Sequence, residues 1–234
     1  MFLFYSRYNI FFKPAYIKIN MQLKKGEFVE IEYSAIDKET GKIFDLTSEE
    51  TAKKEGIYNP NAKHGKIIIC LGEGQILKGL DESLIGKEAD KDYIIELLPE
   101  KGFGKRDNRM MKLVSIELFK KENIRPFPGL RINIDGILGT VRSVSGGRVI
   151  VDFNNPLAGH TVIYKIKMGD VIKDTQKKLE SLLELYDANL KGIIKDNIAE
   201  INNKVSGKES KFLNEKIKKL IPEIKEVKFL DIEK

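Results

Sequence analysis

The stretch from Leu71 to Asp107 constrains the fold of this chain more than any other part of the sequence. It opens with two glycines two positions apart, Gly72 and Gly74. Apolar residues at helical spacing then follow: Ile76, Leu77, Leu80, Leu84 and Ile85. This spacing predicts a helix with a single apolar face, and Gly86 is placed to end it.

A strand and a loop complete this stretch. The run from Tyr93 to Leu98 is typical of a strand, and after Pro99 the loop from Glu100 to Gly104 carries Phe103. The stretch has no His, no Cys pair and no nucleophile paired with a base. A functional site here is therefore an apolar pocket and not a conventional acid/base centre.

Composition sets the class of protein. With 234 residues, 32% of them charged and 41% hydrophobic, we expect a soluble globular chain with room for one large domain or two to three small ones. The one cysteine, Cys70, excludes an intramolecular disulfide and lies in an apolar run expected in the core; it is consistent with a cytoplasmic location. The two histidines, His64 and His160, lie far apart, so we expect no metal site and no cofactor.

Half of the net charge of +6 arises at the N-terminus. The first twenty residues hold three cations and no acid, which leaves 38 basic and 35 acidic residues elsewhere. No basic stripe is present, so no nucleic-acid partner is expected. Residues 1–20 also hold seven of the twenty Phe and Tyr residues, interrupted by Arg7, Lys13 and Pro14, so stable membrane insertion is not expected. Two interpretations stay open: a true start at Met21, and a membrane-surface anchor.

The part of the chain before the glycine-rich stretch predicts two strands and a helix. Residues from Phe28 to Ile36 alternate, which predicts a half-buried strand with four residues on its inner face: Val29, Ile31, Tyr33 and Ala35. Ser48 to Gly56 has a helix-like charge pattern. Ile67 to Leu71 predicts a second short strand.

After the Phe103 loop the pattern changes to short strands. A polar linker is expected from Lys105 to Lys112 and a short apolar element from Leu113 to Phe119. Hairpin turn signals, Asp135-Gly136 and Ser145-Gly146-Gly147, then separate three strand candidates: Arg131–Asp135, Ile137–Val144 and Arg148–Phe153. We therefore predict a small β unit inserted before a strand at Thr161–Met168.

The C-terminal part predicts an α-β-β-α-β module. Leu179, Leu182, Leu183 and Tyr186 share one helix face, and a capping box at Ser206 and Glu209 begins a second helix that Pro222 ends. Strands are expected at Leu190–Lys195, Ile198–Ile201 and Val227–Ile232. A coiled-coil tail is the competing interpretation, against which the glycines Gly192 and Gly207 argue.

Four segments in order carry a resemblance to a known family. They are GKIFDLT (Gly41–Thr47), LGEGQILKGLDESLIG (Leu71–Gly86), PEKGFGKRD (Pro99–Asp107) and VDFNNPLAGHTVIYKI (Val151–Ile166). Together they resemble the FKBP-type peptidyl-prolyl cis/trans isomerases, in particular the long archaeal members related to the SlyD chaperones.

The resemblance implies an α+β fold. We expect an FKBP-like antiparallel β half-barrel around a short helix, with an inserted small β (insert-in-flap) domain and a C-terminal αββαβ module. The expected division is an N-terminal extension at 1–20, an isomerase domain at 21–107 and 154–173, the inserted domain at 108–153 and the module at 174–234.

The resemblance also assigns an apolar site. Matching the family motif gives eight catalytic positions: Tyr33, Phe44, Asp45, Ile76, Leu77, Leu80, Phe103 and Tyr164. In the family the carboxylate matching Asp45 lies close to the twisting carbonyl, and the N–H matching Leu77 holds a substrate carbonyl. From spacing alone, Ile76, Leu77 and Leu80 would be core residues.

Several positions depart from the family pattern. Phe103 stands where a Tyr usually hydrogen-bonds the bound peptide, and a lost bond of this kind is worth about 0.5–1.5 kcal/mol, so weakened activity is expected. Leu80 stands where many members carry Trp, Tyr164 matches a Phe, and Asn155 replaces a His. The His-rich tail of many SlyD proteins is missing.

The implied function is prolyl isomerisation coupled to chaperone action. The partners expected are unfolded or partly folded proteins with X-Pro bonds, which the inserted domain binds. Its candidate client-binding residues are Phe127, Leu130, Ile137 and Leu138, although such residues also close small β cores. The alternative is a non-catalytic holdase on an isomerase fold.

Overall fold

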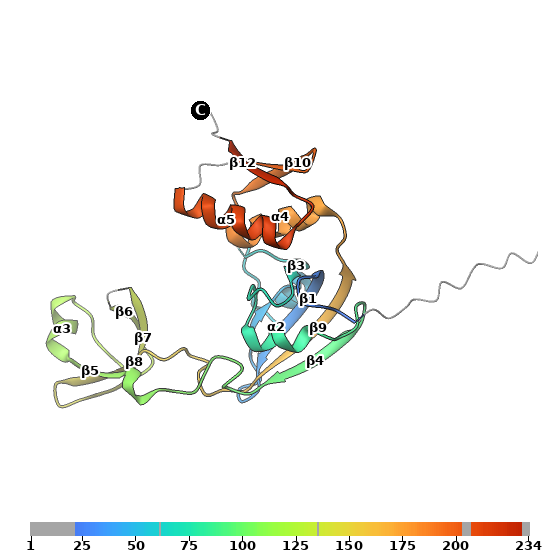
Figure 1. Ribbon diagram of the computed structural model, residues 1–234. Helices are drawn as coiled ribbons and strands as arrows, with labels where there is room; N and C mark the ends of the chain where they lie inside the picture. Colours follow the sequence, from blue (N-terminus) through green and yellow to red (C-terminus); the bar gives the residue numbers. More distant parts are fainter. Residues whose placement is uncertain (1–21, 61, 135, 203–206, 231–234) are drawn as a thin grey trace, which may run out of the picture.

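The computed structural model describes residues 22–60, 62–134, 136–202 and 207–230. Within these ranges it contains three sheets, each with an apolar core of its own (Figure 1). Some of the expectations above depend on residues outside the described part, namely residues 1–20, Asp135, Ser206 and Ile232. No helix in that part is long and apolar enough to cross a membrane.

The main sheet is antiparallel and has the order β2-β1-β9-β4, with β3 pairing to the start of β1. Its strands are β1 (Phe28–Asp37), β2 (Ile43–Leu46), β3 (Ile67–Cys70), β4 (Asp92–Leu97) and β9 (Val162–Val171). The alternation predicted for β1 is confirmed, since Val29, Ile31 and Ala35 are buried together. They pack in one core with Leu80 and Leu84 of helix α2 (Lys78–Leu84). A short helix, α1 (Glu49–Lys54), follows β2 along the chain.

Helix α2 is shorter than its apolar spacing predicts. Ile76 and Leu77 precede it and Ile85 follows it, because Leu77 and Ile85 have extended backbones with ψ of 125° and 131°. Gly79 lets the helix lie against the Phe103 loop: a Cβ atom there would be 2.1 Å from the carbonyl oxygen of Lys101. The consequence is that Ile76 and Leu77 are loop residues at the start of the helix.

The inserted sheet lies to one side of the main sheet and has the order β5-β8-β7-β6 (Figure 1). Its elements are η1 (Asn108–Met110), β5 (Met111–Ser115), α3 (Ile116–Lys121), β6 (Arg131–Ile134), β7 (Ile137–Ser145) and β8 (Arg148–Asp152). The single apolar element predicted from Leu113 to Phe119 is wrong, because Ser115 ends β5 and its hydroxyl accepts from the Glu117 N–H to start α3. The polar linker is also shorter than expected, since β5 starts at Met111.

The C-terminal elements follow the predicted α-β-β-α-β order. They are α4 (Thr175–Tyr186), β10 (Lys191–Lys195), β11 (Ile198–Asn202), α5 (Gly207–Leu220) and β12 (Glu226–Leu230), with sheet order β10-β11-β12. We call this unit the C-terminal module. Phe28 of β1 and Cys70 of β3 are buried in its core, so the module and the main sheet share a packed interface.

Candidate active site

Four aromatic rings from four separate segments meet at one end of the main sheet. The centroid of Phe44 lies 5.6 Å from that of Phe103 and 6.2 Å from that of Tyr164, both edge to face, and Tyr33 lies 5.8 Å from Tyr164. Such offset arrangements are favourable for aromatic pairs. We call these four residues the aromatic cluster.

Aliphatic members of the expected site belong to the same apolar core. Ile76 and Leu77 are half-buried and pack against the same core as the rings, whereas Leu80 is only 1% exposed. The structure therefore brings seven of the eight expected site residues into one apolar group. Leu80 lies beneath it as a core residue and not on its surface.

Asp45, the eighth residue, is exposed at the edge of the cluster. Its Oδ2 accepts a hydrogen bond of 2.8 Å from the Tyr33 hydroxyl. Burial of the phenol and this bond to a carboxylate both raise the pKa of Tyr33. Burial, together with the charge of Asp45, likewise raises the pKa of Tyr164 to about 12. Both hydroxyls are therefore protonated donors at neutral pH.

Thr47 aligns the two strands that carry Tyr33 and Asp45. Its hydroxyl accepts from the Tyr33 N–H at 2.8 Å and donates to the Tyr33 carbonyl at 3.3 Å, and its side chain is buried with it. Residue spacing does not single out Thr47, which lies one residue beyond β2 and is buried whereas Asp45 is exposed.

The start of α2 offers a free backbone donor. Leu77 is the N-cap without a side-chain cap, and its carbonyl accepts from the N–H groups of Leu80 and Asp81. Among the described residues, the Leu77 N–H has no hydrogen-bond acceptor. Unpaired amides at a helix start attract carbonyl oxygens and anions.

Comparison with known proteins identifies the family. The Methanocaldococcus jannaschii protein named short-type peptidyl-prolyl cis-trans isomerase is 34% identical to this chain over 149 residues, covering 64% of this chain and 94% of that protein. A family model described as FKBP-type peptidyl-prolyl cis-trans isomerase matches residues 20–117. The chain belongs to this FKBP family.

Other matches cover the rest of the FKBP-like region. SlyD from Treponema pallidum, an FKBP-type isomerase, is 28% identical over 167 residues, covering 70% of this chain and 86% of that protein. A family model described as FKBP26, IF domain matches residues 112–157, nearly all of the inserted sheet. The crystal structure of the three FKBP domains of wheat FKBP73 aligns with 66% of this chain and 42% of that one, at 12% identity and a TM-score of 0.35. The α+β FKBP fold expected from the sequence is confirmed.

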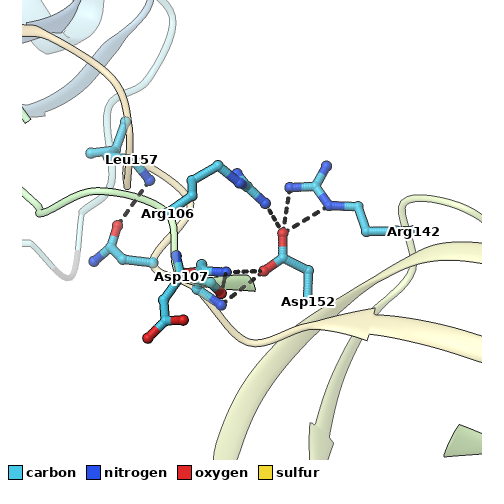
Figure 2. Close-up of polar contacts among 7 residues, drawn as sticks. Arg106, Asp107, Arg142, Asp152 and Leu157 are labelled. Carbon is cyan, nitrogen blue, oxygen red and sulfur yellow. Dashed lines mark hydrogen bonds and ion pairs between the residues drawn. The ribbon is translucent and has the colours of Figure 1, made fainter. Parts of the chain in front are cut away.

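A buried carboxylate joins the inserted sheet to the FKBP unit. Asp152, whose side chain is 2% exposed, forms ion pairs with Arg106 of the incoming linker and with Arg142 of β7, whose Nη2 is 2.9 Å away (Figure 2). Its other oxygen accepts from Asn154, and Asn154 accepts from the Asp107 N–H at 2.8 Å. Both linkers are thus tied at one point, which no spacing in the sequence indicated.

The four candidate client-binding residues differ in exposure. Leu138 is 72% exposed, and Phe127 and Ile137 are each 56% exposed. Leu130 is half-buried against the core of the inserted sheet and closes that core. Three of the four side chains are therefore exposed on the inserted sheet and the loop before it.

A hollow of about 480 Å³ lies on the outer face of the main sheet, where its lining includes Glu32, Ser34, Ile94 and Lys165. Tyr33 of the aromatic cluster also lines this hollow, so the two features meet at this residue. No group of three or more His, Cys, Asp or Glu residues in the described part is arranged to hold a metal ion.

Proposed function

We propose that the aromatic cluster is the pocket in which this FKBP-type isomerase rotates X-Pro peptide bonds. The observation that carries the proposal is the packing of four rings, Ile76 and Leu77 on one apolar core, with Asp45 exposed beside Tyr33. Rotation about the amide costs about 18–20 kcal/mol because resonance is lost. Apolar walls favour the twisted amide, which is less polar than the planar one, and each tenfold in rate needs only about 1.4 kcal/mol.

Polar groups at the rim orient the substrate. The unpaired N–H of Leu77 holds a peptide carbonyl. The Asp45 carboxylate, kept in place by the Tyr33 hydroxyl at 2.8 Å, lies beside the carbonyl that rotates. No covalent bond is made or broken, so no nucleophile, metal or cofactor enters this mechanism.

The inserted sheet is proposed as the client-binding chaperone domain. A groove of about 460 Å³ lies between α3 and the edge strand β6, lined by apolar side chains that include Leu118, Ile124, Ile132 and Ile134. An edge strand presents unpaired backbone groups to an extended chain. Ile137 and Leu138, at the start of the next strand β7, are also exposed. A client bound to these side chains would have its X-Pro bonds at a raised local concentration near the pocket.

Two substrates test the pocket and the client surface separately. Asp45→Asn is expected to lower kcat/KM about fivefold both on an X-Pro tetrapeptide and on a proline-limited refolding protein, since a hydrogen-bonding charge at the exposed rim is lost. Ile137→Ser with Leu138→Ser should lower only the rate on the protein. Ile94→Ser, which removes a 74% exposed apolar side chain from the main sheet, is the matched control. Equal loss on both substrates from the Ile137 and Leu138 changes would contradict the proposed division.

A holdase without isomerase activity is the second candidate, favoured by Phe103, which has no hydroxyl to bind the peptide. It requires that the wild-type chain suppress aggregation of an unfolded protein but leave the tetrapeptide rate at its uncatalysed value.

We also propose the domain division 21–107 with 154–173, 108–153 and 174–234. We further propose a cytoplasmic location, where the free thiol of buried Cys70 stays reduced.

A further inference from the structure

The segment Leu71–Leu77, which we call the pocket loop, joins β3 to α2 and ends in the two aliphatic residues of the proposed pocket. Glu73 lies in it between two glycines whose φ angles are +78° at Gly72 and +69° at Gly74. Glycine adopts such angles at no steric cost but also leaves the chain the most freedom. A loop of this composition keeps one shape only when contacts from outside hold it.

Inside the FKBP unit, two side chains supply such contacts. Asp81 of α2 is buried and accepts from the N–H groups of Gly72 and Gly74 at 2.7 and 2.9 Å. The Gln75 side chain accepts from the N–H of Cys70 at 2.5 Å. These bonds hold the inner side of the pocket loop but leave the Glu73 side chain directed elsewhere.

Glu73 is held from the C-terminal module. Its side chain is 7% exposed and accepts hydrogen bonds of 2.9 Å from Lys216 and of 2.9 and 3.0 Å from Lys219, both on α5. Burial alone would raise the pKa of Glu73, but the two ammonium groups hold it below its usual value. Glu73 is thus an ionised, almost buried carboxylate whose charge partners come from another unit of the fold.

We propose that Glu73 is a positioning residue through which the C-terminal module sets the pocket loop for substrate binding. Only three residues separate Glu73 from Leu77, and the loop between them has no other attachment to α5 or α4 among the described hydrogen bonds. Small misplacements of a binding group lower the rate strongly. The inference rests on the proposed pocket, because the N–H of Leu77 is the group being placed.

Variants at both ends of this contact test the proposal in the full chain. Glu73→Gln, and Lys216→Met with Lys219→Met, should each lower kcat/KM on the X-Pro tetrapeptide about three- to tenfold, mainly by raising KM. Combining all three changes should not lower kcat/KM below the value of the single-site or two-lysine variant. Reversing the charges, with Glu73→Lys, Lys216→Glu and Lys219→Glu together, should restore at least half of the loss.

Controls separate positioning from general stability. Lys195→Met breaks a 2.9 Å ion pair with Glu200 inside the same module and should leave KM at the wild-type value. If Glu73→Gln does not fold, the two-lysine variant decides alone, since Lys219 is 64% exposed. Unchanged KM in the two-lysine variant, or charge reversal without rescue, overturns the proposal. Asp45→Asn in the same assay tells the two failures apart: if it too has no effect, the pocket assignment itself is wrong.

Discussion

Tyr164→Phe is expected to make the free energy of unfolding fall less steeply with pH under alkaline conditions. The native pKa of Tyr164 is about 12, because the phenol is buried and faces the charge of Asp45, whereas an unfolded tyrosine titrates near 10. A raised native pKa means that the unfolded chain loses its proton first as the pH increases. The stabilisation is therefore complete below about pH 10 and is lost between about pH 10 and 12.

The size of the effect follows from the two pKa values. One group with such a shift changes the free energy of unfolding by about 1.4 kcal/mol per pH unit, and by about 2–3 kcal/mol in all. Urea unfolding followed by far-ultraviolet circular dichroism from pH 8 to about 12 measures it. Tyr58→Phe, at a position 41% exposed, controls for the loss of a phenol as such. Parallel stability curves for the wild type and Tyr164→Phe would refute the linkage.

Three further substitutions follow from the geometry. Phe103→Tyr adds a hydroxyl at the pocket rim and should raise kcat/KM on the tetrapeptide by about two- to tenfold, since one hydrogen bond is worth about 0.5–1.5 kcal/mol; no change would show that the peptide does not reach this ring. Gly79→Ala places a Cβ 2.1 Å from the Lys101 carbonyl oxygen and should cost about 2–3 kcal/mol in urea unfolding. Asp152→Asn should lower the free energy of unfolding by about 2 kcal/mol. This is less than the loss from breaking a fully buried ion pair, because Arg106 and Arg142 both reach solvent. Protease cleavage at the linkers should increase in parallel.

The local pattern of the sequence was enough to predict most strands and the order of the C-terminal elements. Alternation placed Val29 and Ile31 inside the main sheet because a strand has only two faces. It did not predict that Phe28, on the opposite face, would be buried in the core of the C-terminal module. That contact depends on which unit packs on the sheet, and no periodicity within one strand carries this information.

The site was predictable only through the family motif. Ile76 and Leu77 have helical spacing, yet they precede the helix, because Asp81 binds the two loop amides and the chain is extended at Leu77. The ion pairs of Glu73 could not be predicted either, since Lys216 lies 143 positions further along the chain. Contacts over such separations depend on the packing of whole units and leave no trace in residue spacing.

The pocket loop and the inserted sheet are held by separate polar contacts, and this predicts how their effects combine. Glu73 bonds to α5 alone, whereas Asp152 bonds to the two linkers and β7. Leu138 is 72% exposed on β7, so its side chain is not in the set of contacts that holds Glu73. Perturbations without shared partners usually add in free energy within about 0.3–0.5 kcal/mol. Glu73→Gln combined with Leu138→Ser should therefore lower the refolding rate of a proline-limited protein by the product of the two single effects. A combined loss much smaller than this product would mean that the C-terminal module and the inserted sheet act on the client through one step, and that the pocket is not positioned independently of client capture.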